Sequence, residues 1–141
     1  MLTEIGKRVK IASVQLSVAT TDEKNRILKA IADALRENSE KIIKANEIDI
    51  QNGVNNGMSK ALLDRLMLNG ERIEGMAQGV EDVISLPDPV GKILWEEERP
   101  NGLKIQRVSS PLGVIGIIYE ARPNVTVDAA SLCLKSGNTV I

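Results

Sequence analysis

Arg122 and Asn124 are the residues of this chain whose types and position best suit chemistry. They lie in a short polar turn that follows a strongly apolar stretch, residues 114–119. Such a stretch is typical of a parallel strand buried on both faces. Because ligands of open α/β sheets bind at the carboxyl ends of strands, both side chains are expected beside a ligand. Both side chains donate hydrogen bonds at the place where a substrate or cofactor would lie.

Each of these side chains also has a purely structural interpretation. Asn124 precedes an expected helix over residues 125–135, and an asparagine there is typical of an N-cap that accepts an N–H from the first turn. Arg122 is equally well suited to a salt bridge with Glu120 or Asp128 and to gripping a carboxylate or phosphate with its planar guanidinium.

The composition excludes several classes of function. Lys and Arg total 18 against 19 Asp and Glu, and there is one Trp and one Tyr, so neither a basic surface nor stacking platforms for nucleic acid are expected. Hydrophobic residues make up 43% of the chain, enough for a folded core. The N-terminus lacks the apolar centre of a signal peptide, and no apolar window is long enough to span a bilayer. A cytoplasmic protein without a membrane partner is therefore expected.

The catalytic inventory is small. The chain has no histidine and one cysteine, Cys133, so neither a disulfide nor a metal site is expected. Cys133 lies between Leu132 and Leu134 on an expected helix, where a free cysteine is typical of a small core residue rather than a nucleophile. Acid–base chemistry within this chain would fall to carboxylates, lysines or the tyrosine.

Helices are expected over most of residues 3–84, separated by polar breaks. Thr20 and Glu23 have capping-box spacing, Ser59 and Asn69 suit N-caps, and Asn52-Gly53 is expected to end the third helix. Helical spacing predicts these inward faces: Leu2, Ile5, Val9, Ala12 and Leu16; Ile27, Ala30, Ile31 and Ala34; Ile43 and Ile50; Leu62, Leu63, Leu66 and Met67; Ile73, Met76, Ala77, Val80 and Ile84.

A β-hairpin is expected next, with arms at residues 92–99 and 103–108. The Asn101-Gly102 pair suits a type I′ turn, and the alternation of Leu103 and Ile105 with polar residues predicts one buried face. After the helix over residues 125–135, with Gly137 as its C′ residue, a parallel strand is expected to begin at Thr139. A parallel strand without the elements that normally follow it predicts an unfinished architecture, and hence a longer protein.

The run PLGVIGIIYEARPNVT, followed by VDAASLCLKSGNTVI, resembles the signature of the γ-glutamyl phosphate reductase family of proline biosynthesis, in the aldehyde dehydrogenase superfamily. The resemblance is close over residues 110–141 and extends more loosely over the whole chain. It implies an α/β fold with N-terminal helices and the start of a Rossmann-like parallel sheet. It divides the chain into a helical segment of the cofactor domain (1–90), an oligomerisation hairpin (91–110) and the first strand–helix–strand of the NADP-binding domain (111–141).

By this resemblance the function is NADPH-dependent reduction of L-glutamate 5-phosphate to L-glutamate 5-semialdehyde and phosphate. A cysteine thiolate, absent from this chain and downstream in the family, would form a thioacyl-enzyme. Asn124 would donate to the oxyanion and Arg122 would bind substrate. Glu120, Ala121 and Pro123 would lie beside the nicotinamide half of NADPH, mainly through their backbone.

The resemblance also implies a homo-oligomer and a chain that has no reductase activity by itself. Two alternatives stay open: another acylating aldehyde dehydrogenase, or a non-catalytic assembly module. Gly113 and Gly116 do not form the dinucleotide fingerprint and are expected to serve strand packing.

Overall fold

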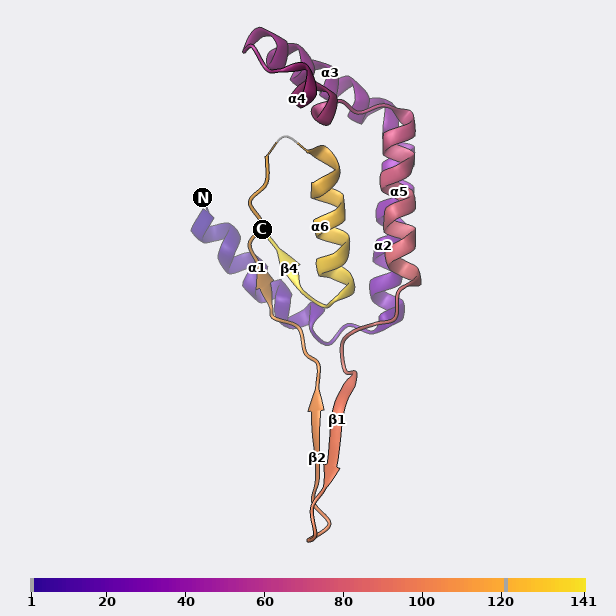
Figure 1. Ribbon diagram of the computed structural model, residues 1–141, viewed down its shortest axis with the longest axis vertical. Coiled ribbons are helices and arrows are strands. Elements are labelled where there is room, and N and C mark those ends of the chain that lie inside the picture. Colours follow the sequence, from indigo (N-terminus) through magenta and orange to yellow (C-terminus); the bar gives the residue numbers. More distant parts are fainter. Residues whose placement is uncertain (1, 121) are drawn as a thin grey trace.

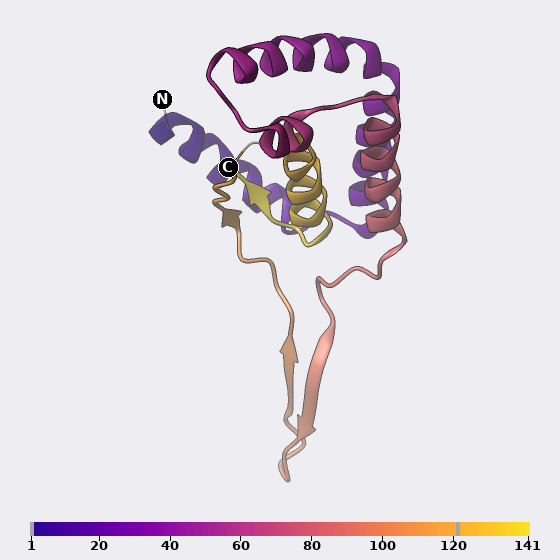
Figure 2. The same cartoon turned by 45° about the horizontal axis from the view of Figure 1, so that its top comes forward.

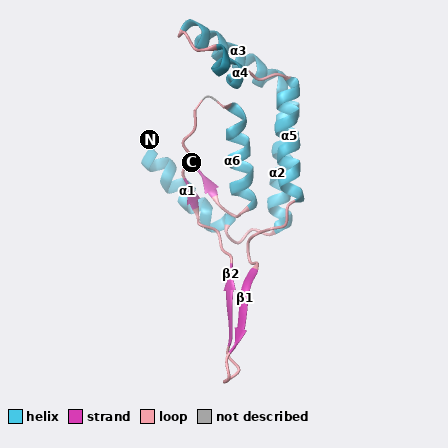
Figure 3. Cartoon of the chain, in the orientation of Figure 1, coloured by secondary structure: helices cyan, strands magenta, loops and turns pink. Residues whose placement is uncertain are grey.

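The computed structural model describes residues 2–120 and 122–141, which form a mixed α/β structure (Figure 1). Helices occupy the N-terminal part, and strands first appear after residue 90 (Figure 3). The elements are, in order, α1 (Leu2–Leu16), α2 (Thr21–Glu37), α3 (Ser39–Asn55), α4 (Lys60–Leu66), α5 (Gly70–Ser85), β1 (Ile93–Glu98), β2 (Lys104–Val108), β3 (Val114–Ile115), α6 (Pro123–Lys135) and β4 (Thr139–Val140). No helix among these residues has the length and apolar character needed to cross a membrane.

The core lies where α2, α5 and α6 pack together. Figure 1 shows α2 and α5 side by side, with α6 next to them. The predicted inward face of α5 is confirmed. That of α2 is wrong in part, because Ile31 packs against the core whereas Ile27, Ala30 and Ala34 are exposed. The buried residues of α2 are Lys24, Leu28 and Ala32. Apolar residues cover more than one side of α2, so periodicity allowed two faces, and packing against α5 and α6 selected one of them.

The predicted N-caps at Thr20, Ser59 and Asn69 are confirmed, whereas the predicted end of the third helix is wrong. Thr20 and Glu23 form the capping box, and Asn69 accepts from the backbone N–H of Arg72 at 2.8 Å. However, α3 continues through Gly53. A Cβ at this position would lie 2.9 Å from Cδ2 of Leu63, so the glycine allows α3 and α4 to pack closely rather than ending the helix.

The hairpin of β1 and β2 extends away from the helices (Figures 1 and 2). Its turn differs from the expected type I′. The Gly102 N–H donates to the Arg99 carbonyl at 2.8 Å, so Pro100 and Asn101 are the central pair, and Gly102 follows at φ +80°. Proline holds φ near −65°, which excludes a type I′ turn centred on it and favours a type I turn followed by a left-handed glycine.

One face of the hairpin carries Trp95 and Ile105 together with Glu97 and Arg107, and this face is not buried. The register pairs Trp95 with Arg107 and Glu97 with Ile105, which places Trp95 and Ile105 on the same face. The predicted alternation is therefore confirmed. The predicted burial is wrong for this chain: Trp95 is 43% exposed and Ile105 37% exposed, because no other described element covers the hairpin.

The C-terminal block is a parallel β–α–β unit, as expected. β3 pairs with β4, and the N–H groups of Thr139 and Ile141 donate to the carbonyls of Gly113 and Ile115, both at 2.9 Å. The predicted buried strand over residues 114–119 is only partly formed, and Ile118 is fully exposed. Among the described residues β3 pairs only with β4, and the backbone pairing continues as far as Ile117, whose N–H donates to the Ile141 carbonyl at 2.9 Å. Gly137, at φ +72°, follows α6 as predicted.

Candidate functional site

The helix that carries Asn124 begins earlier than the sequence suggested. α6 starts at Pro123, and Arg122 is its N-cap residue with an extended backbone and no capping by its side chain. Proline suits the first helical position because its φ is already helical and its missing N–H needs no partner there. The interpretation of Asn124 as the N-cap is therefore wrong, since Asn124 lies inside the first turn of α6.

The carboxamide of Asn124 points along the helix to an acidic neighbour. Its Nδ2 donates to Oδ2 of Asp128 at 3.0 Å, one turn further on, and both side chains are exposed. A primary amide carries two N–H donors, so this bond orients the group and leaves a second donor for another acceptor. The geometry is compatible with an oxyanion donor, a role that stays a prediction.

The expected salt bridge of Arg122 with Glu120 or Asp128 does not form, and no described residue forms an ion pair with Arg122. Glu120 is exposed in the segment before α6, and Pro123 is half-buried. Ala121, the remaining residue predicted at the cofactor, lies outside the described residues.

Arg122, Pro123 and Asn124 line one cavity of about 470 Å³, which also contacts the turn between α4 and α5. This size is in the range of small-molecule sites. The other lining residues are Asp64, Arg65, Met67, Leu68, Arg72, Gly75, Met76 and Asp128. Arg65 and Arg72 were not among the predicted site residues. Charged residues on an amphipathic helix are usually solvated, and no local sequence pattern indicates that these two lie near Arg122 and Asn124.

Arg72 fixes the shape of the α4–α5 side of this cavity. Its guanidinium donates to the Asp64 carboxylate at 2.9 Å, to the Met67 carbonyl at 2.8 Å and to the Asp64 carbonyl. An arginine that spans three acceptors in this way holds the turn between the two helices in one conformation. We therefore assign Arg72 a structural role in the cavity wall.

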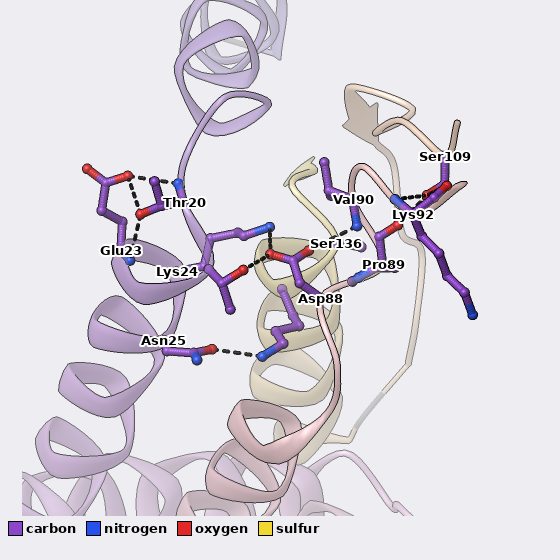
Figure 4. A network of polar contacts seen from close by, with 12 residues as sticks. Thr20, Glu23, Lys24, Asn25, Asp88, Pro89, Val90, Lys92, Ser109 and Ser136 are labelled. Atoms are coloured by element: carbon purple, nitrogen blue, oxygen red, sulfur yellow. Dashed lines mark hydrogen bonds and ion pairs between the residues drawn. The ribbon is translucent and has the colours of Figure 1, made fainter. Parts of the chain in front are cut away.

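A buried polar network holds the opposite end of α6 (Figure 4). Lys24, 1% exposed, forms a 2.6 Å ion pair with Asp88, and Lys135 donates to Asn25 Oδ1 and to the Ile84 carbonyl, both at 2.8 Å. The network connects α2, the segment after α5 and the last turn of α6. Helix α6 is thus anchored by Lys135 at its end and presents Asn124 at its start.

Burial and pairing shift the pKa values in this network. Burial alone would raise the pKa of Asp88, but hydrogen bonds from Lys24 and Thr21 hold it below its ordinary value. Burial lowers the pKa of Lys135. Neither Lys24 nor Lys135 was predicted to be buried. The sequence around a buried lysine does not differ in any regular way from the sequence around a surface lysine.

Cys133 is a core residue, as predicted. It is 7% exposed, and burial raises the pKa of its thiol, which disfavours the thiolate that a nucleophile needs.

Comparison with known proteins gives a consistent result. No family model matches the chain. The chain is 50% identical over 141 residues to the γ-glutamyl phosphate reductase of Brucella suis, and 57% identical over 136 residues to that of Heliobacterium modesticaldum. These matches cover 100% and 96% of the chain but only 34% and 33% of the relatives. The chain therefore spans about a third of the length of the curated relatives it matches.

Solved structures of the same enzyme match equally well. The γ-glutamyl phosphate reductase of Thermotoga maritima superposes with a TM-score of 0.97 at 48% identity, covering 99% of this chain and 34% of that one. The enzyme of Saccharomyces cerevisiae gives 0.92 at 37% identity, covering 97% and 35%. The described fold and the sequence thus agree that this chain is similar, over essentially its full length, to the N-terminal third of γ-glutamyl phosphate reductases.

Proposed function

We propose that the protein containing this chain reduces L-glutamate 5-phosphate to L-glutamate 5-semialdehyde and phosphate in the cytoplasm. The observation that carries the proposal is full-chain similarity to enzymes of that name, together with a cavity that Arg122 and Asn124 line. NADPH would supply the hydride when bound. The exposed segment between β3 and α6 suits its nicotinamide half, because it follows the carboxyl end of a parallel strand.

The chain's own residues would bind and stabilise the reacting group. Asn124 donates an N–H to the carbonyl oxygen as negative charge develops on it, and its bond to Asp128 sets the direction of that donor. Arg122 binds the leaving phosphate through its guanidinium. Glu120, Ala121 and Pro123 would contact the nicotinamide half of NADPH when it is bound. The thiolate that attacks the acyl carbon comes from outside this chain, since Cys133 is buried in the core.

Each part of the chain then has a role in the complete enzyme. Residues 1–90 form the helical segment of the cofactor domain, residues 91–110 form an arm for homo-oligomerisation, and residues 111–141 begin a Rossmann-like NADP-binding domain. The exposed side chains of Trp95 and Ile105 support the second assignment, because large apolar side chains left uncovered on a protruding element are typical of an interaction surface.

The test is an assay of the full-length enzyme in the direction of aldehyde oxidation. Glutamate 5-semialdehyde, NADP⁺ and phosphate should give NADPH, whereas coenzyme A in place of phosphate should not. Activity only with coenzyme A would favour another acylating dehydrogenase. A tight oligomer that binds no nucleotide would favour the assembly module. The 141-residue chain should show no turnover above a blank without protein.

A further inference from the structure

The cavity beside Asn124 contains more positive charge than its own acidic residues neutralise. Of its two carboxylates, Asp64 is paired with Arg72 and Asp128 accepts from the Asn124 carboxamide. Arg65 and Arg122 also line the cavity, and neither forms an ion pair with a residue in the described ranges. The cavity is therefore lined by three arginines and two aspartates, a net positive charge that favours an anionic ligand, and two of the arginines are not committed to an ion pair among the described residues.

These two guanidinium groups come from different elements. Arg122 precedes α6 and is two residues from Asn124, so it belongs to the end of the cavity where the acyl group would react. Arg65 comes from α4, which lies across the N-terminal end of α6 (Figure 2). Because Arg72 holds the turn between α4 and α5, the position of Arg65 relative to α6 is supported by the fold rather than by a loose loop.

We propose that Arg65 binds the α-carboxylate of the glutamyl substrate. Arg65 would thereby make the enzyme specific for an amino acid whose side chain carries the acyl phosphate. The proposal rests on the function proposed above, whose substrate carries an anionic group at each end of a short chain. With Arg122 at the acyl phosphate, the second unpaired guanidinium of the cavity matches the second anion. A guanidinium fork suits a carboxylate because two parallel N–H groups can bond its two oxygens.

The experiment compares Arg65→Gln with wild type in the full-length enzyme, measured in the direction of aldehyde oxidation. Its KM for glutamate 5-semialdehyde should rise by about ten- to a hundredfold, the usual cost of losing a charge-assisted hydrogen bond. The KM for phosphate should not change, and Arg65→Lys should restore part of the loss. Lys60→Gln is the matched control, because it removes one positive charge from the exposed start of the same helix outside the cavity.

A substrate analogue isolates the carboxylate. With 4-aminobutanal, which lacks the α-carboxylate, wild type and Arg65→Gln should have the same kcat/KM. An unchanged KM for glutamate 5-semialdehyde in Arg65→Gln, or an equal loss with both aldehydes, would overturn the role of Arg65 and leave the proposed function intact. A wild-type enzyme that does not oxidise glutamate 5-semialdehyde would overturn both. Circular dichroism of each variant separates these results from a failure to fold.

Discussion

The Asn124 carboxamide donates to the Asp128 carboxylate at 3.0 Å, across one turn of α6. This bond replaces the capping role that the sequence favoured, because Pro123 already occupies the first helical position. An exposed asparagine that neither caps a helix nor packs in the core contributes little to stability. Because the bond to Asp128 fixes the direction of the carboxamide, the side chain is suited to donate a hydrogen bond to a ligand.

Asn124→Ala should therefore separate stability from catalysis. The free energy of unfolding of the 141-residue chain, measured in urea, should change by less than about 0.5 kcal/mol, as for an ordinary surface substitution. In the full-length enzyme, kcat should fall by on the order of a hundredfold, with NADPH binding nearly unchanged, because an oxyanion donor acts mainly in the transition state. Thr20→Ala is the stability control, since it removes a capping box and should cost about 1 kcal/mol. A matching loss of stability in Asn124→Ala would indicate a structural role instead.

Asp88→Ala should be one of the most destabilising single changes in the chain. It leaves the ammonium group of Lys24, which is 1% exposed, without its carboxylate, and an uncompensated buried charge typically costs about 3–5 kcal/mol. Asp33→Ala removes one of the two carboxylates that pair with the exposed Lys29 and should cost less than about 1 kcal/mol. Equal losses in the two variants, measured by urea denaturation, would show that burial does not govern the Lys24–Asp88 pair.

Glu81 should make the stability depend on pH in the acidic range. Hydrogen bonds from Arg36 and then Lys29 lower its pKa from 4.5 to about 2. A carboxyl with a lower pKa in the folded state contributes stability above its unfolded pKa and loses it as the pH falls through the folded value. The difference in stability between wild type and Glu81→Gln should thus be present at pH 7 and shrink from about pH 4.5 toward pH 2.

The control for this titration is Glu47→Gln, an exposed carboxyl on α3 for which no ion pair exists among the described residues. This variant removes a carboxyl group without breaking an ion pair, so it measures the effect of the Glu→Gln change by itself. A difference between wild type and Glu81→Gln that does not change with pH would contradict the pairing of Glu81 with Arg36 and Lys29.

The hairpin face that carries Trp95 and Ile105 should become buried when the full-length enzyme assembles. Ile105→Arg places a charge on the face that carries Trp95 and should lower the oligomeric mass in sedimentation experiments. Gln106→Arg adds the same charge to the opposite face and should leave assembly intact. Because Trp95 is the only tryptophan, its fluorescence should be less quenched by iodide in the oligomer than in the 141-residue chain. Equal effects of the two arginines would argue against an arm used in this way.

The sequence by itself determined the features that depend on neighbours along the chain. The capping box of Thr20, the inward face of α5 and the parallel β–α–β order follow from local hydrogen bonding and apolar periodicity. The position of Cys133 between Leu132 and Leu134 on an expected helix likewise predicted a core residue. These features are readable because each uses residues within a few positions of one another.

Only the tertiary structure decided which distant residues meet. It selected the Leu28 face of α2, buried Lys24 against Asp88, and brought Arg65 to the cavity of Arg122. An amphipathic helix with apolar residues on two sides can pack either way, and a lysine or arginine looks alike in sequence whether it is solvated or enclosed. The free energy that settles these choices comes from burial and charge pairing between elements, which local sequence patterns do not contain.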